Sequence, residues 1–242
     1  MIPRRGPGPQ AALLLFGIAA PLAVFSYLGD EVRERERMAG DFGTLRFVHA
    51  HGTDGLDFLM RGVSFVGVGA PLALVAVALS LLLLRRQKPT AGVFLVVGLV
   101  SAQLIAQELK VAFHRPRPQL WTPAHPEGGF AFPSAHATQS MALASALVFL
   151  AWRTRWRRSA LIGGSVFVLL VGISRVYLGA HYPSDVLGGW CVALAWVTTL
   201  WLVLTTLTAH YGSGTRAKAR GTRQAAHQAG AQVEKLISAH LA

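Results

Sequence analysis

Six long runs without Asp, Glu, Lys or Arg constrain this chain more than any other feature. They cover Gly6–Gly29, Gly62–Leu84, Pro89–Gln107, Gly128–Trp152, Ser159–Ser174 and Val186–Thr215. A helix needs about 20 predominantly apolar residues to cross the hydrocarbon core of a bilayer. The sequence therefore predicts an all-α, polytopic membrane protein with six transmembrane helices, the fifth of which ends near the membrane interface.

The composition excludes other classes of protein. Hydrophobic residues make up 52% of the 242 residues and charged residues only 14%, whereas soluble domains carry roughly 25% charged residues. Disorder is excluded by the apolar content, and the same content argues against nucleic acid as the partner despite the net charge of +12. The single cysteine, Cys191, excludes an intramolecular disulfide and is expected to pack within the sixth span.

The first apolar run has an alternative interpretation as a signal peptide, because Arg4 and Arg5 precede it. The apolar core of a signal peptide extends over only about 7–15 residues and ends at a small-residue cleavage site. The run Gly6–Gly29 is longer and no such site follows it. We therefore expect it to remain as a membrane helix.

The basic residues predict the orientation, because Lys and Arg concentrate on the cytoplasmic side. The two ends and the second and fourth loops share a strong excess of them, with Glu234 as their one acidic residue. The basic residues concerned are Arg4, Arg5, Arg85, Arg86, Lys88, Arg153, Arg155, Arg157, Arg158, Arg216, Lys218, Arg220, Arg223 and Lys235. We expect both termini in the cytoplasm and the first, third and fifth loops outside the plasma (inner) membrane.

This orientation divides the chain into three parts. Residues 1–9 form a cytoplasmic N-terminus, residues 10–211 the six-helix membrane domain, and residues 212–242 a basic cytoplasmic tail attracted to anionic lipid. The outer loop 30–61 contains the run Glu31–Arg37, whose alternating charges predict a solvated amphipathic helix. The alternative is a bent segment at the membrane surface that gates access to the site.

Residues of types that take part in catalysis or anion binding gather at the outer ends of the expected spans, where ionisable groups are usually functional. The set is Lys110, Arg117, Ser134, Ala135, His136, Arg175, His181 and Asp185. Three cations in this set suit a phosphate group, since Arg offers a planar fork and Lys a point charge. Ser134 is a candidate N-cap, which would turn the amides of Ala135 and His136 toward an anion.

Two histidines and one carboxylate complete the set. Asp185 follows His181 by four residues and could hold one imidazole nitrogen, so that the other becomes nucleophilic. His136 could then protonate the leaving oxygen. These residues predict phosphoryl transfer through a phosphohistidine, followed by attack of water.

This set of residues has two other interpretations. Two histidines and a carboxylate can bind iron or zinc, but the three neighbouring cations would repel a divalent ion and attract a phosphate. Histidines at helix ends can also simply cap carbonyls, and arginines can extend toward the interface. The convergence of all these residues on one side of the membrane favours a phosphate site without metal or cofactor.

The same residues resemble the three-part signature of the type 2 phosphatidic acid phosphatases, a superfamily that includes vanadium haloperoxidases and glucose-6-phosphatase-like enzymes. The three parts are Lys110-(six residues)-Arg117-Pro118, Pro133-Ser134-Ala135-His136 and Ser174-Arg175-(five residues)-His181-(three residues)-Asp185, within a resemblance covering roughly Phe47 to Val203. The family's second motif usually has Gly where Ala135 stands. Alanine keeps the backbone N–H but excludes conformations that only glycine adopts.

The resemblance implies a role for each matching residue. His181 would be the nucleophile, Asp185 its orienting partner and His136 the general acid. Phosphate oxygens would be held by Lys110, Arg117, Ser134 and Arg175, and no metal would be needed. Arg115 and His114 flank the first motif, where they either contact a headgroup or second phosphate or serve the structure alone.

The sequence thus predicts a lipid phosphatase or diphosphatase whose partners are a lipid phosphate substrate and the surrounding membrane lipids. Candidate substrates are undecaprenyl pyrophosphate, which we favour, phosphatidylglycerophosphate, phosphatidic acid and diacylglycerol pyrophosphate. A phosphotransferase that passes the phosphate to another lipid is one alternative. A phospholipid binder or transporter without chemistry is another, and the paired His181 and Asp185 argue against it.

Overall fold

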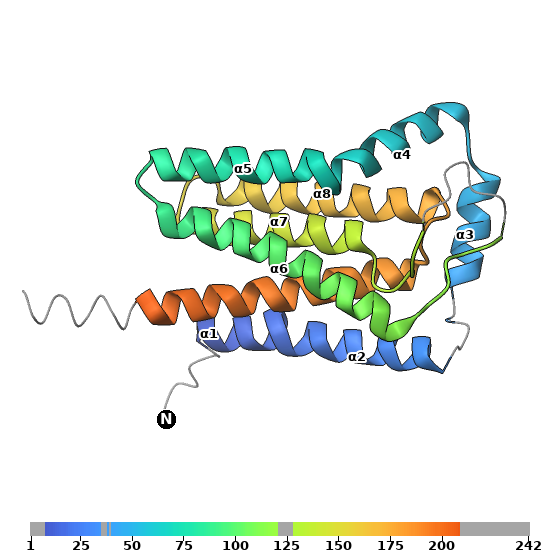
Figure 1. Cartoon of the computed structure of the whole chain (residues 1–242), viewed down its shortest axis with the longest axis horizontal. Helices are drawn as coiled ribbons and strands as arrows, with labels where there is room; N and C mark the ends of the chain where they lie inside the picture. Colours follow the sequence, from blue (N-terminus) through green and yellow to red (C-terminus); the bar gives the residue numbers. More distant parts are fainter. Residues whose placement is uncertain (1–7, 35–37, 39, 121–127, 209–242) are drawn as a thin grey trace, which may run out of the picture. The chain divides into compact units, whose positions relative to one another are not determined.

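The computed structural model describes residues 8–34, 38, 40–120 and 128–208, and within these ranges it consists of helices and their connections (Figure 1). The helices are α1 (Pro9–Ala12), the π-helical segment η1 (Leu13–Ala19), α2 (Ala20–Arg33), α3 (Asp41–Ala50), α4 (Asp54–Val66), α5 (Gly69–Arg85), α6 (Pro89–Phe113), α7 (Ala135–Ala151) and α8 (Arg157–Tyr177). A further helix, here called the C-terminal helix, covers Pro183–Thr208. The chain divides into Met1–Trp201 and Leu202–Ala242, and the packing described below is that of the first unit.

The all-α prediction is confirmed, and the apolar helices agree with a membrane protein. Among the described residues, four helices are long and apolar enough to cross a bilayer: Gln10–Arg33, Pro89–Phe113, Arg157–Tyr177 and Pro183–Thr208. The pair α4 and α5 passes the same test as one span bent by 49°, while α7 is a shorter apolar helix. The count of six full spans therefore stays a prediction.

Two of the expected spans differ from the structure. The run Gly62–Leu84 is not one continuous helix, because α4 ends at Val66 and α5 begins only at Gly69, whose φ is 70°. Such a left-handed conformation is readily adopted by glycine and interrupts the helix. The run Gly128–Trp152 is helical only from Ala135, since Ser134 caps α7 and the preceding residues form the irregular approach to it.

The segment expected as the outer loop 30–61 contains several helical pieces. The charged run begins inside α2, which continues to Arg33, and residues 35–37 lie outside the described residues. The short helix α3 follows, and the first turns of α4 complete the segment. The tail 212–242 and residues 1–7 also lie outside the described residues.

Large apolar side chains cover the outside of the helices. Leu74 on α5, Leu104 on α6 and Ile162 on α8 are each 60–70% exposed. A soluble protein rarely exposes such an extensive apolar surface. These helices therefore present a surface suited to lipid.

The core of this unit is built around α7. This helix packs against α6 on one side and α8 on the other, and α8 also contacts α3 and α4 (Figure 1). The C-terminal helix lies very close to the start of α7. A Cβ on Gly189 would lie 2.7 Å from the carbonyl oxygen of Ser134, and a Cβ on Gly188 would lie 2.5 Å from the Phe132 ring. Two glycines thus allow the two segments that carry the signature motifs to touch.

Gly189→Ala is expected to destabilise the protein by about 1–3 kcal/mol, because the added methyl group meets backbone that cannot move aside. Gly163→Ala is the matched control, since a Cβ at Gly163 meets nothing within 4 Å. Thermal unfolding in detergent measures both. Equal melting temperatures for the two variants would contradict the close packing described here.

Candidate phosphate-binding site

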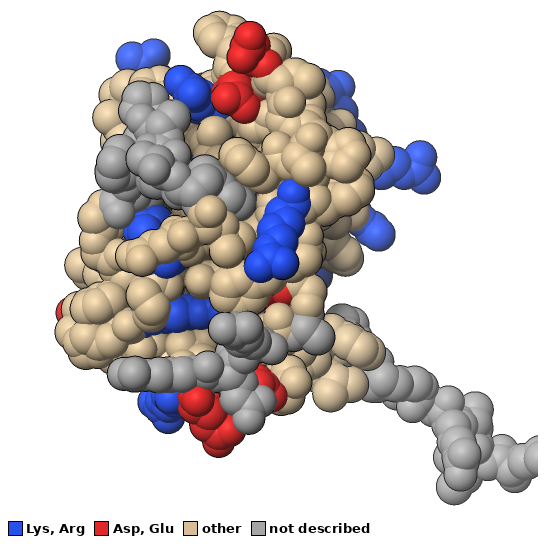
Figure 2. Space-filling model, turned by 90° about the vertical axis from the view of Figure 1, so that its right-hand side faces the viewer, with Lys and Arg blue, Asp and Glu red and all other residues tan. Residues whose placement is uncertain are grey.

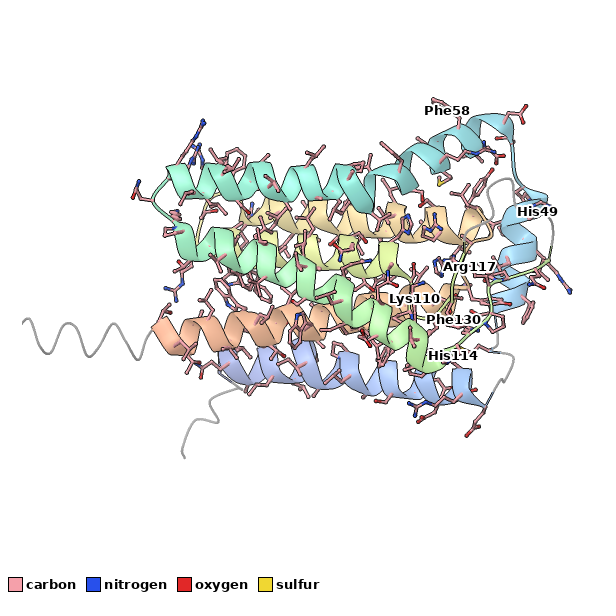
Figure 3. All side chains as sticks on the ribbon, in the orientation of Figure 1. His49, Phe58, Lys110, His114, Arg117 and Phe130 are labelled. Carbon is pink, nitrogen blue, oxygen red and sulfur yellow. The ribbon has the colours of Figure 1, made fainter. Side chains whose placement is uncertain are left out.

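A cavity of about 430 Å³ lies where α6 ends and α7 begins. It is lined by Val68, Gln103, Gln107, Lys110, Val111, Arg117, Gly128, Gly129, Phe130, Ala135, His136 and His181. Five of the residues proposed from the sequence are thus brought together: Lys110, Arg117, Ala135, His136 and His181. Figure 3 shows Lys110, Arg117 and Phe130 close together at one end of the helices, near the end of α6.

The end of α6 supplies the first two cations. Lys110 lies in the last turn of α6, is only 7% exposed, and donates a hydrogen bond from Nζ to the carbonyl oxygen of Phe130. His114 ends the helix in the left-handed conformation, with a φ of 49°. The chain then turns to bring Arg117 over the cavity, where its guanidinium donates to the carbonyl oxygens of Ala180 at 2.9 Å and Gly128 at 3.2 Å.

The N-terminus of α7 forms another wall. Ser134 is fully buried and is the N-cap residue, accepting a hydrogen bond at Oγ from the Ala137 N–H at 3.5 Å. Ser134 does not line the cavity itself, but Ala135 and His136 in the first turn do. The positive end of the helix dipole therefore faces the cavity, as an anion site requires.

His181 and Asp185 lie next to each other in the structure. His181 Nδ1 lies 3.4 Å from Asp185 Oδ2, and both side chains are almost fully buried. On the other side of the ring, His181 Nε2 lies 3.2 Å from Nη1 of Arg117. A guanidinium only donates hydrogen bonds, so this contact assigns the acceptor role to Nε2, which corresponds to the tautomer with the ring proton on Nδ1, facing the carboxylate.

Arg175 occupies a different position from the other two cations. Its side chain is 2% exposed, does not line the cavity, and donates a hydrogen bond to Oγ of Ser64 on α4. Its carbonyl oxygen accepts hydrogen bonds from the N–H groups of Ala180 at 3.1 Å and His181 at 3.3 Å. Arg175 therefore fixes the turn that carries His181.

The structure also reveals a charged cluster that the sequence did not predict. Arg115 lies 2.5 Å from Asp185 Oδ1 through Nη1 and 2.8 Å from Asp41 Oδ2 through Nη2. Burial lowers the pKa of Arg115, but the adjacent Asp185 and Asp41 carboxylates outweigh it and raise the pKa above its ordinary value. Arg115 is thus part of the support behind the cavity and does not line it.

Little in the sequence indicates this cluster. Asp41 opens α3, about 140 residues before its partner Ser184, which donates to it from its backbone N–H at 3.0 Å and from Oγ at 2.6 Å. A carboxylate at the start of a helix is usually explained by the helix dipole alone. Gln103 and Gln107 were missed as lining residues too, although their spacing places them on the same face of α6 as Lys110.

The side chains around the cavity indicate whether it suits a metal ion or an anion. Within the described ranges, no group of three or more His, Cys, Asp or Glu side chains is arranged to hold a metal ion. Around the cavity, the donors beside His181 are instead cationic, Lys110 and Arg117. This set of side chains fits an anion.

Comparison with known proteins agrees with these observations. The family model described as the PAP2 superfamily matches residues 91–209. Phosphatidylglycerophosphatase B of Bacillus subtilis is 28% identical over 144 residues, which cover 57% of this chain and 70% of that protein. Undecaprenyl-diphosphatase BcrC of Bacillus subtilis is 35% identical over 134 residues, which cover 50% of this chain and 64% of that protein.

A solved structure shows the same fold. The transmembrane PAP2 type phosphatidylglycerolphosphate phosphatase from Bacillus subtilis superposes with a TM-score of 0.67 at 24% sequence identity, covering 78% of this chain and 96% of that one. Residues 91–209 therefore form a PAP2 superfamily domain, and the relatives that this chain resembles are named as lipid phosphatases. The family resemblance inferred from the three sequence motifs is confirmed.

Orthovanadate, a phosphate analogue, is expected to raise the melting temperature of the detergent-solubilised protein, because a ligand that binds only the folded state stabilises it. Arg117→Gln should weaken this binding about 10- to 100-fold, the cost of losing a hydrogen bond to a charged group. Arg61→Gln is the matched control, since Arg61 is half exposed and contacts only Asp57 at 3.7 Å among the described residues. An unchanged vanadate response in Arg117→Gln would contradict the assignment of the cavity.

Proposed function

We propose that this protein hydrolyses a lipid phosphate monoester or diphosphate through a phosphohistidine formed on His181, without a metal or other cofactor. The observation that carries the proposal is the placement of the His181 ring. Its Nδ1 faces a buried carboxylate, and its Nε2 faces Arg117 at the cavity wall. An imidazole held in this tautomer directs the lone pair of Nε2 toward the place where a phosphate would bind.

In the first step, Nε2 of His181 attacks the phosphorus atom and the bond from phosphorus to the lipid oxygen breaks. His136 donates a proton to that oxygen, so the lipid leaves as an alcohol or as a lipid monophosphate. Asp185 stabilises the positive charge that develops on His181. Arg117 moves its hydrogen bonds from His181 to the phosphate oxygens, where the negative charge spreads in the transition state.

In the second step, His136 takes a proton from a water molecule whose oxygen attacks the phosphohistidine. The bond between phosphorus and Nε2 breaks, inorganic phosphate is released and both histidines return to their first state. Lys110, Arg117 and the first turn of α7 hold the phosphate oxygens through both steps. Ser134 and Arg175 support this arrangement from behind the cavity.

We infer that the cavity faces the outside of the cell. The turn at the other end of α7 carries tryptophans beside arginines, with the guanidinium of Arg157 4.3 Å from the Trp152 ring and that of Arg155 5.1 Å from the Trp156 ring. Tryptophan is typical of membrane interfaces and clustered arginine of the cytoplasmic side. The opposite end of α7, which lines the cavity, is then extracytoplasmic.

The end of the molecule around α3 fits an anionic headgroup. Figure 2 views this end and shows Lys and Arg side chains across it, with Asp and Glu gathered mainly near two margins. A headgroup could bind there while the lipid tail stays among the apolar helices. The names of the relatives make phosphatidylglycerophosphate and undecaprenyl diphosphate the first substrates to test.

Two alternatives share this site. A phosphotransferase would use the same phosphohistidine and pass the phosphate to another lipid, so it would release no inorganic phosphate. A phospholipid binder would need the cations but no oriented imidazole. The contact between His181 and Asp185 favours an enzyme over a binder.

Purified protein is expected to release inorganic phosphate from undecaprenyl diphosphate, phosphatidylglycerophosphate or phosphatidic acid in detergent with EDTA present. His181→Ala should abolish the release, since the residue supplies the nucleophile. His51→Ala is the matched control, because His51 is exposed and its side-chain contacts within the described residues are local, to the carbonyl oxygen and the ring of Phe47. Loss of release in EDTA alone would mean that the histidines bind a metal, and lipid phosphorylation without release would favour the transferase.

His136→Ala should lower phosphate release from a lipid by about 10²–10⁴-fold, the usual contribution of a general acid or base. The first step should be less affected with p-nitrophenyl phosphate, because nitrophenolate leaves without a proton. A burst of nitrophenolate followed by slow turnover is the expected result, measured by rapid-mixing absorbance. Equal loss of the burst and of lipid hydrolysis would contradict the role of His136 as general acid.

A further inference from the structure

Arg115 occupies the centre of a buried cluster that adjoins the site without entering it. Its two terminal nitrogens contact two different carboxylates, Asp185 and Asp41. Nη1 also donates to Ser184 Oγ at 2.7 Å, and the guanidinium carbon lies 4.3 Å from the centre of the Tyr182 ring. The plane of the guanidinium is therefore fixed by contacts on its edge and on its face.

The orientation of Asp185 depends on the same contacts. Its Oδ1 accepts from Arg115, and its Oδ2 accepts from the Tyr182 N–H at 2.9 Å and faces His181 Nδ1 at 3.4 Å. These partners define the plane of the carboxylate. Without Arg115, Oδ1 would be a buried charged atom lacking its cation, and such a group rotates or recruits another partner to avoid that cost.

We propose that Arg115 is the positioning residue of Asp185, and that Asp41 on α3 in turn holds Arg115, so that α3 must be docked for His181 to be oriented. This inference rests on the proposed function. Arg115 acts through Asp185 because the cavity lining does not include it. The outer segment between α2 and α4 thereby becomes part of the catalytic support, through a chain of contacts from Asp41 to His181.

Asp41 is well suited to this task. It is 3% exposed, and its two oxygens bind different groups: Oδ1 accepts from the Ser184 N–H, and Oδ2 accepts from Ser184 Oγ and from Arg115. Phe42, the next residue of α3, packs its ring 5.4 Å from that of Tyr182. Helix α3 is thus attached by charge and by aromatic contact to the turn that carries His181 and Asp185.

The test is a double-mutant cycle on phosphate release, with Arg115→Met and Asp185→Asn made singly and together. Residues that act as one unit have strongly non-additive effects on kcat. We expect Arg115→Met to lower kcat about tenfold or more in the wild-type background but less than about twofold in the Asp185→Asn background. KM and inhibition by orthovanadate should change by less than about threefold, because the phosphate-binding residues are untouched.

Two further variants test the same contacts and remain informative if Arg115→Met does not fold. Arg115→Lys keeps the charge but lacks the fork that spans both carboxylates, and should restore part of kcat. Asp41→Asn keeps an acceptor for Ser184 but loses the ion pair, and should lower kcat only while Asp185 is present. Arg33→Met is the matched control, since Arg33 is exposed and its described contact is with the Phe113 ring at 5.0 Å.

The proposal would be overturned if Arg115→Met lowered kcat by the same factor in the wild-type and Asp185→Asn backgrounds. A rise in KM at constant kcat would overturn it as well. If Arg115→Met does not fold, Asp41→Asn and Arg115→Lys decide the matter by the same comparison. Failure of the proposed function would look different. In that case the wild-type protein would release no phosphate or His181→Ala would retain full activity, whereas failure of this inference leaves the wild type active and His181→Ala inactive.

Discussion

The arrangement of this protein depends on one buried carboxylate, that of Asp185, which is fully shielded from solvent. A carboxylate at such a place is stable only when cations and hydrogen-bond donors surround it. Arg115 and the Tyr182 N–H provide these partners, and His181 lies on the remaining side. The need to satisfy this one group brings α3, the end of α6 and the start of the C-terminal helix to the same point.

The polar side chains of the site come together at helix ends in a largely apolar protein. Lys110 comes from the last turn of α6, Ser134 caps α7, and His181 lies in the turn between α8 and the C-terminal helix. Within the bilayer each backbone N–H and C=O is satisfied inside its own helix, whereas helix ends leave donors and acceptors available. Gly188 and Gly189 allow these ends to approach each other closely enough to share one cavity.

Much of the fold and of the site could be predicted from the sequence, and the features that were missed have no local sequence pattern that would indicate them. Uncharged runs predicted the apolar helices, and the fixed spacing of three motifs predicted that Lys110, Arg117 and His181 would meet. The bend between α4 and α5 was missed because hydrophobicity continues through it. Asp41 was missed because its role depends on a contact with Arg115 from a distant part of the chain, and no local pattern encodes that contact.

The proposed mechanism requires a covalent bond between phosphorus and Nε2 of His181, the nitrogen turned away from Asp185. The most direct measurement mixes the protein with p-nitrophenyl phosphate for one turnover and quenches it in alkali, where phosphohistidine survives. Peptide mass spectrometry and ³¹P NMR then locate the phosphate. We expect a phosphate on Nε2 of His181. A phosphate on another residue, or turnover with no labelled protein at any quench time in wild type and in His136→Ala, would contradict it.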